Sequence, residues 1–152
     1  MDGTPGQVEG VQRWHAAVAH TADVGVRATA PDPGGLLEEA ATALAELSAD
    51  VSHAKHLRAQ EIEVRADDLA ALTFAWLNEL VGLADALGEA LVEARVERLD
   101  ASPDGWLARG KATFAAYDAQ VQPRQQVKAA TFHRLKVARQ PDGWNLEAYF
   151  DV

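Results

Sequence analysis

The amino-acid sequence predicts an α+β fold, a two-layer sandwich in which two helices pack on one face of a mixed, mainly antiparallel sheet. Three observations support this class: two segments with helical periodicity, about seven segments with strand character, and hairpin-type turns between the late strands. With 152 residues, 48% of them hydrophobic, the chain is long enough for one core. We therefore expect a flexible tail over residues 1–12 and a single domain over residues 13–152.

Two strands are expected near the start of the chain, and a polar run separates them. The strands cover Trp14 to Ala19 and Val24 to Ala30, and the sequence from His20 to Gly25 reads His-Thr-Ala-Asp-Val-Gly. Asp, Thr and Gly favour turns, because their side chains hydrogen-bond nearby backbone groups or they tolerate unusual backbone angles. Asp23 is therefore expected at a strand end, with its carboxylate directed outward.

Two helices follow from apolar residues at three- and four-residue spacing. The first is expected over about residues 34–48, after the chain-breaking Pro31–Gly35 run. The second and stronger pattern covers Leu69 to about Leu87, with an N-cap in Asp67-Asp68 and a stop at Gly88. Trp76 lies on its apolar stripe and is interpreted as a core residue.

The rest of the chain alternates apolar and polar residues as strands do. Turn signals at Ser102–Gly105 and Pro141–Gly143 separate the late strands. The strands are expected over residues 56–66, 90–99, 106–117, 127–138 and 144–152.

Composition limits the possible partners. Fourteen Lys and Arg against 23 Asp and Glu give a net charge of -9, which repels nucleic acid, so no direct nucleic-acid binding is expected. The absence of cysteine excludes a disulfide scaffold and a thiolate metal site. No signal peptide is recognised, and no window is expected to span a membrane. We therefore expect a cytoplasmic protein without a membrane partner.

Catalytic motifs are not found in the sequence. The five histidines lack the spacing of a zinc site, and the chain has no GxSxG elbow, Walker loop or GxGxxG sequence. No nucleophile with an adjacent base can be assembled from a visible motif. We therefore predict that the protein is not an enzyme.

Two aspartates are the candidates for a cation site. Asp23 lies at the predicted turn, and Asp151 follows Phe150 at the end of the last strand, where Val152 could add a carboxylate or carbonyl oxygen. Oxygen ligands of this kind suit Ca²⁺ or Mg²⁺ and reject soft metals. The alternative is that Asp151 is only solvated, and the sequence alone does not bring the two aspartates together.

Four blocks of sequence together resemble the archease family. They are His20 to Gly25, Trp76-Leu-Asn-Glu-Leu80, Val127-Lys-Ala-Ala-Thr-Phe-His133 and the closing Phe150-Asp-Val152, in order from Trp14 onward. The resemblance implies an α+β fold and a role as activator of an RtcB-type RNA ligase in tRNA splicing and RNA repair. Archeases promote formation of the guanylylated ligase and multiple turnover.

The resemblance also implies site residues. The family's divalent cation is bound through the positions matched by Asp23, Asp151 and Val152, and we expect Ca²⁺ first, with Mg²⁺ or Mn²⁺ as alternatives. Lys128 matches a family lysine and resembles a contact for the ligase; the simpler interpretation is a solvated lysine. His20 and Asp50 are secondary candidates, with loop anchoring and loop capping as their simpler interpretations.

Two positions depart from the family pattern. Ala19 stands where the family usually has Asp before the histidine, and Gln126 where many relatives have Glu. The loss of one acidic group predicts weaker affinity for the cation. Apart from the ligase activator, the sequence leaves open a general protein chaperone or a divalent-cation-binding interaction module, with an enzyme as a third alternative.

Overall fold

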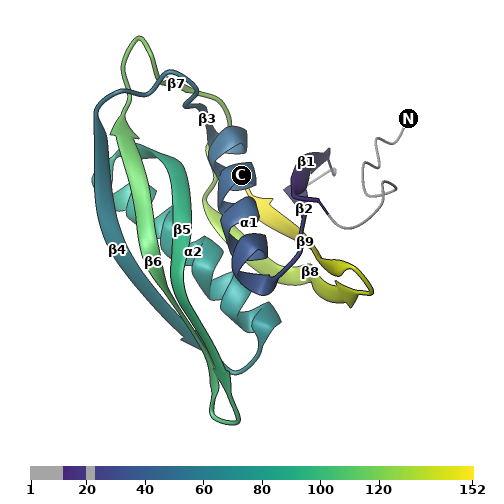
Figure 1. Ribbon diagram of the computed structural model, residues 1–152. Coiled ribbons are helices and arrows are strands. Elements are labelled where there is room, and N and C mark those ends of the chain that lie inside the picture. The colour runs from purple at the N-terminus through teal and green to yellow at the C-terminus, as the bar shows by residue number, and fades with distance from the viewer. Residues whose placement is uncertain (1–11, 20–22) are drawn as a thin grey trace.

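The computed structural model describes residues 12–19 and 23–152 and shows an α+β fold, which confirms the predicted class (Figure 1). The predicted tail, residues 1–12, lies outside the described residues except for Gln12. The helices are α1 (Pro33–Ser48) and α2 (Leu69–Leu87). The strands are β1 (Trp14–Ala19), β2 (Val24–Ala30), β3 (Ala49–Asp50), β4 (Leu57–Ala66), β5 (Glu89–Ser102), β6 (Gly105–Ala116), β7 (Gln122–Pro123), β8 (Ala129–Gln140) and β9 (Gly143–Asp151).

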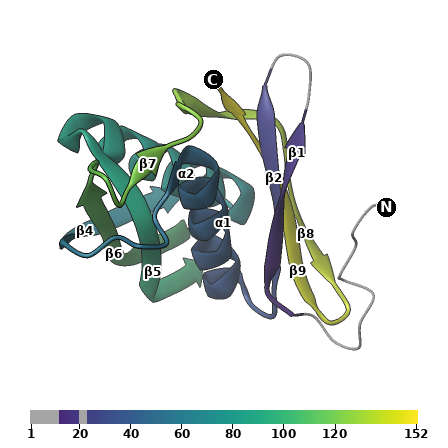
Figure 2. The same cartoon turned by 90° about the horizontal axis from the view of Figure 1, so that it is seen from above.

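The strands divide among separate sheets, whereas the sequence predicted a single one. A four-stranded sheet has the order β1-β2-β9-β8, a three-stranded sheet the order β4-β6-β5, and β3 pairs with β7. All strand pairs in the described part of the chain are antiparallel, so the sheets are not mixed. Both helices lie between the two larger sheets and contact each of them (Figure 2).

Apolar residues around a wide part of α2 explain why a second sheet covers the helices. A helix with a narrow apolar stripe buries one face, whereas a broader stripe requires cover on two sides. In α2 the fully buried side chains include Leu72, Trp76, Leu77 and Leu80. The indole Nε1 of Trp76 donates a 3.0 Å hydrogen bond to the carbonyl of Leu37 in α1, so this residue packs in the core and also joins the two helices.

The sequence analysis expected no segment that could span a membrane, and α2 corrects this expectation. At 19 residues with a mean hydropathy of 1.2, α2 is long and apolar enough to cross a membrane by length and composition alone. Core helices pass the same criterion, and α2 contacts both larger sheets.

Capping residues place the helix ends near the positions that the sequence predicted. The Asp32 carboxylate accepts a 2.7 Å hydrogen bond from the Gly35 amide at the start of α1. At the start of α2 the Asp68 carboxylate accepts one of 2.8 Å from Ala71. Such caps satisfy amide groups that have no partner within the helix. Gly88 ends α2 in the left-handed conformation, at φ 64°.

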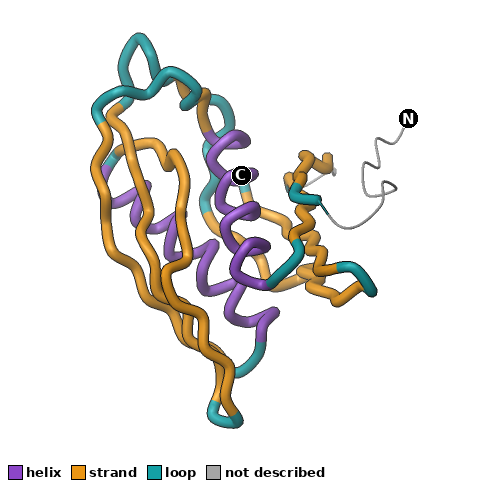
Figure 3. The backbone as a smooth tube through the Cα atoms, viewed as in Figure 1, coloured by secondary structure: helices purple, strands orange, loops and turns teal. Residues whose placement is uncertain are grey.

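Two β-bulges explain the uneven apolar spacing in β5. Its apolar residues Leu91, Ala94, Val96 and Leu99 include two intervals of three residues, which regular alternation does not produce. The pairing with β6 shifts between Leu91 and Glu93 and again between Val96 and Arg98, so one extra residue is inserted at each place. Long β5 and β6 are joined by a tight hairpin, visible in Figure 3.

A larger bulge in β8 corrects the predicted face of that strand. Regular alternation over the predicted strand 127–138 would place Thr131, His133 and Val137 on one side. In the structure Thr131 pairs with Tyr149 and Lys136 with Glu147, so four residues of β8 lie opposite one residue of β9. The extra residues invert the alternation, and Val137 faces the core while Thr131 faces the opposite side of the sheet.

Strand β1 is fastened to α1 by a histidine held between two glutamates. One ring nitrogen of His15 hydrogen-bonds Glu39 and the other hydrogen-bonds Glu46. Burial by itself lowers the pKa of His15, but the hydrogen bonds with Glu46 and Glu39 outweigh it and raise the pKa above its ordinary value of 6.5. The imidazolium form is therefore the one that bridges both glutamates.

Substitution of Trp76 tests the helix junction. Trp76→Ala is expected to lower the free energy of unfolding by about 3–5 kcal/mol, because it removes a fully buried indole. Trp76→Phe retains most of the volume but leaves the Leu37 carbonyl without its donor, at a smaller cost of about 1–3 kcal/mol. Urea unfolding measures both, with exposed Glu79→Ala as control. An unchanged free energy of unfolding in Trp76→Phe would contradict the role of the hydrogen bond.

The His15 bridge predicts a pH-dependent stability. Because the folded-state pKa is raised, the stabilisation is complete below the unfolded-state pKa and is lost as the pH rises through the folded-state pKa. The loss in unfolding free energy caused by His15→Ala should therefore be larger at about pH 6 than at about pH 9. Denaturant unfolding at both pH values measures it. In a Glu39→Gln/Glu46→Gln background the pH dependence of that loss should disappear, and its persistence there would contradict the assignment.

Candidate functional site

The pairing of β2 with β9 brings the two predicted aspartates to the same end of one sheet. Val24 pairs with Phe150, and the next positions outward on the two strands are Asp23 and Asp151. Directly opposed residues on antiparallel strands lie on the same face of the sheet. The two aspartates, 128 positions apart in the sequence, are therefore neighbours at one sheet end.

The third strand at this end brings Lys128 to the same place. Its backbone N–H donates a 2.8 Å hydrogen bond to the carbonyl of Asp151, and Ala129 pairs with Asp151. The side chains of Lys128 and Asp151 are exposed, as is Val152, at 39%. Asp23, Asp151, Val152 and Lys128 together form a cluster that we call the strand-end site.

The Asp23 carboxylate is engaged by an arginine that the sequence analysis did not single out. Nη2 of Arg134 lies 2.7 Å from Oδ1 and 2.8 Å from Oδ2 of Asp23. The Arg134 side chain is 33% exposed and that of Asp23 is 16% exposed, so the pair is partly removed from water. Hydrogen bonds between ionised partners are stronger than neutral ones, and partial burial strengthens them further.

The β8 bulge is what aims Arg134 at Asp23. Arg134 lies inside the four-residue bulge and has a left-handed backbone, with φ of 65°. Its guanidinium carbon is 4.1 Å from the centre of the Tyr149 ring, a cation–π contact. That contact helps to explain why Tyr149 is only 2% exposed although it faces away from the core.

Gly25 makes room for the Tyr149 ring. A Cβ atom at this position would lie 2.7 Å from two ring carbons of Tyr149, closer than carbon atoms approach. The glycine that closes the predicted turn motif therefore allows the ring to lie against β2. Burial and a hydrogen bond to Glu147 raise the pKa of Tyr149, so the hydroxyl stays protonated at neutral pH.

Helix α2 holds the start of β8 through Asn78. The Asn78 carbonyl oxygen accepts a 2.9 Å hydrogen bond from the Ala130 amide, and its amide group donates one of 3.5 Å to the Ala130 carbonyl. Ala130 lies between Lys128 and the bulge. Asn78 thus positions both, a role that its place in a helix did not reveal.

The donor set suits a hard cation only in part. Asp23, Asp151 and Val152 offer oxygen atoms, the ligand type of Ca²⁺ and Mg²⁺. In the described arrangement, however, both carboxylate oxygens of Asp23 face Arg134. Among residues 12–19 and 23–152 no group of three or more His, Cys, Asp or Glu side chains is arranged to hold a metal ion. A cation could therefore use Asp23 through both oxygens only after Arg134 moves.

The secondary candidates have separate positions. His20 lies outside the described residues. Asp50 is in β3, where its Oδ1 accepts hydrogen bonds of 2.7 Å from the Ser52 hydroxyl and 3.1 Å from the Ser52 amide. The hydroxyl hydrogen bond is the main cause that lowers the pKa of Asp50. Asp50 therefore caps its loop, the simpler of its two predicted roles.

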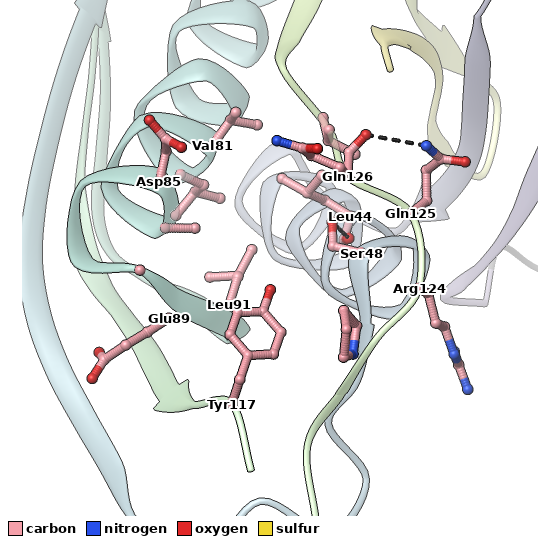
Figure 4. A pocket seen from close by; sticks show the side chains of 15 residues that line it. Leu44, Ser48, Val81, Asp85, Glu89, Leu91, Tyr117, Arg124, Gln125 and Gln126 are labelled. Carbon is pink, nitrogen blue, oxygen red and sulfur yellow. Dashed lines mark hydrogen bonds between the residues drawn. The ribbon is translucent and has the colours of Figure 1, made fainter.

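A cavity of about 390 Å³ lies beside the strand-end site and includes none of its residues. Leu44, Leu80 and Leu91 are among its apolar lining residues. Tyr117 lies next to Leu91 (Figure 4). Gln126, the second departure from the family pattern, lines its wall shortly before Lys128. The backbone of this wall is tied to the last turn of α1, since the Arg124 amide donates a 2.9 Å hydrogen bond to the Ser48 carbonyl.

One signal in the sequence could have located Arg134. The apolar residues Ala130 and Phe132 occupy even positions of the strand, whereas Leu135 and Val137 occupy odd ones. Such a change of parity indicates a bulge between them. It does not say where Arg134 points, because that depends on the tertiary neighbours Asp23 and Tyr149.

Asn78 substitutions test the anchor of β8. Asn78→Ala removes the acceptor of the Ala130 amide and is expected to lower the free energy of unfolding by about 1–2 kcal/mol and to speed hydrogen exchange at Ala130. Asn78→Asp retains an acceptor oxygen and should protect that amide better than Asn78→Ala. Exposed Glu79→Ala serves as control. Unchanged exchange at Ala130 in Asn78→Ala would contradict the anchor.

Comparison with known proteins shows similarity to one protein family. Residues 15–152 match the model of the Archease protein family (MTH1598/TM1083). The chain is 34% identical to protein archease of Thermococcus gammatolerans over 138 residues, which cover 88% of this chain and 93% of that protein. It is 32% identical to probable protein archease of Mycobacterium tuberculosis over 154 residues, covering 99% of this chain and 79% of that protein.

Solved structures show the same fold. Protein 1598 of Methanobacterium thermoautotrophicum, solved in solution, aligns with a TM-score of 0.77 and 25% identity over 91% of this chain and 98% of that one. The crystal structure of an archease from Thermotoga maritima, described as a possible chaperone, aligns with a TM-score of 0.59 and 23% identity, over 89% of this chain and 94% of that one.

Proposed function

This chain belongs to the archease family, and from that premise we propose that it is a non-enzymatic activator of an RtcB-type RNA ligase in tRNA splicing and RNA repair. In this proposal the protein binds the ligase and promotes its guanylylation and repeated turnover in the cytoplasm. The observation that supports it most directly is the strand-end site. Asp23, Asp151 and Lys128, which match family positions in three separate sequence blocks, lie at the same end of three adjacent strands.

Charge supports a basic partner surface. The chain carries a net charge of -9, and the strand-end site places exposed Asp151 at the end of a strand. A ligase that binds nucleotide and RNA phosphates needs a positively charged cleft. Complementary charge speeds encounter with such a cleft and makes association sensitive to salt.

The strand-end site is held by packed strands, which suits it to position groups against a partner protein. Phe150, beside Asp151, is fully buried, and the Asp151 carbonyl is held by the Lys128 amide at 2.8 Å. Groups held by packed strands and helices keep their geometry on contact with a partner. In the proposed complex Lys128 contacts the ligase, and Asp151 and Asp23 face its nucleotide site.

The proposed divalent cation, with Ca²⁺ as first choice and Mg²⁺ or Mn²⁺ as alternatives, would be held by Asp23, Asp151 and Val152. A bound cation would supply positive charge for phosphate oxygens in the ligase site. The remaining work falls to residues of this chain: Lys128 contributes an exposed positive charge at the same end of the sheet, and Asn78 holds Ala130 in place at the start of β8.

Ligase guanylylation tests the proposed function. A purified RtcB-type ligase should form guanylylated enzyme faster, and complete more turnovers, with this protein than without it. Lys128→Ala and Asp151→Asn should each lower the stimulation by about tenfold or more, the loss of a charged contact worth about 1.4 kcal/mol. Lys136→Ala, which removes an exposed lysine from β8, the strand that Lys128 precedes, is the matched control. Equal rates with and without the wild-type protein would exclude the proposal.

Two alternative functions are a general chaperone and a divalent-cation-binding interaction module. The partner that the protein binds distinguishes them from the ligase activator. The Thermotoga maritima archease is described as a possible chaperone, and Phe132, 55% exposed, is an apolar contact that unfolded clients could use. Suppression of aggregation of unrelated proteins, without stimulation of the ligase, would favour the chaperone.

A further inference from the structure

We propose that Arg134 is a built-in competitor for the cation at Asp23, so that a divalent ion and the Arg134 guanidinium bind this carboxylate alternately. The inference rests on the cation site of the proposed function and deepens it. It adds a residue that limits the affinity of the site and that must move when an ion binds.

The position of the Arg134 nitrogen is the first support. Nη2 lies 2.7 and 2.8 Å from the two Asp23 oxygens, so one nitrogen bridges both of them. An ion that binds a carboxylate through both oxygens takes the same place, at about 2.3–2.6 Å from each oxygen for Ca²⁺. An ion and Nη2 cannot occupy that place together.

The second support is that Arg134 is held there by an aromatic contact and by the backbone of the bulge. Its guanidinium packs on the Tyr149 ring at 4.1 Å, and that ring in turn lies against Gly25, where no side chain would fit. The residue has a left-handed backbone at φ 65°, which a non-glycine residue adopts only at a cost. A side chain held in this way loses little further freedom when it binds Asp23, so it competes effectively.

Displacement of Arg134 would couple the ion to the β8 bulge. The bulge comprises residues 132–135, and its Phe132 ring makes an edge contact with Phe74 of α2 at 5.4 Å between ring centres. Release of the guanidinium breaks the ion pair between the bulge and Asp23, the residue that precedes β2. An ion at Asp23 is therefore expected to change the conformation of the surface that carries Phe132.

Cation titration of the isolated protein tests the competition. The affinity of Arg134→Ala for Ca²⁺, measured by calorimetry, should exceed that of the wild type by about tenfold or more, since an ion binds only the fraction of molecules in which Asp23 is released. Arg139→Ala is the matched control: it removes the same charge from the same strand, where Arg139 lies over Trp144. Mn²⁺ and Mg²⁺ are titrated in parallel.

Three outcomes would overturn the inference. Equal gains in Ca²⁺ affinity in Arg134→Ala and Arg139→Ala would show that the effect comes only from the change in net charge. A loss of Ca²⁺ affinity in Arg134→Ala would show that Arg134 supports ion binding instead of competing with it. A gain that persists in Arg134→Ala/Asp23→Asn would place the ion elsewhere. Arg134→Lys, which keeps the charge, should fall between the wild type and Arg134→Ala.

A measurement on the wild-type protein tests the same inference if the Arg134 variants fail to fold. During titration with Ca²⁺, the NMR signal of the Arg134 guanidinium N–H should shift together with the backbone signals of residues 132–135. Saturation without any change in these signals would also overturn the inference. Because no ligase is present, a failure of ligase stimulation rejects the proposed function and leaves this result standing.

Discussion

The antiparallel pairing of β2 with β9 is the interaction on which the rest of the structure depends. It joins a strand near the start of the chain to the last one, and it places Val26, Ala28 and Ala30 beside Ala148 and Leu146 on the face that covers α1. The same register sets Asp23 next to Asp151. One set of backbone hydrogen bonds therefore closes the core and assembles the strand-end site, so the site exists only in the folded chain.

The two helices between the sheets give this pairing its support. Trp76 joins α2 to α1 through the Leu37 carbonyl, and Asn78, two residues further, fixes Ala130 at the start of β8. The core contact and the site anchor thus come from one turn of a single helix.

The bulge in β8 interrupts the regular strand at the point where Arg134 contacts Asp23. A regular strand would direct alternate side chains to opposite faces and would leave no backbone position for Arg134 beside Tyr149. The extra residues place a guanidinium over an aromatic ring and against Asp23. Strained backbone at such a place is typical of sites where geometry matters more than local stability.

The sequence by itself determined the class of the fold, most element boundaries and the identity of the strand-end residues. The helix cap at Asp68, the stop at Gly88 and the core position of Trp76 follow from local rules, because capping and periodicity depend on residues a few positions apart. Asp23, Asp151 and Lys128 were found by their sequence blocks, without knowledge of their arrangement.

Only the tertiary structure decided how these parts meet. The division of the strands among separate sheets depends on how wide an apolar surface α2 presents to each side, and the face of Val137 depends on a bulge that inverts the alternation. The partner of Asp23 depends on Arg134, 111 positions away, and on the ring of Tyr149. Contacts between distant residues are set by packing, which a local pattern does not encode.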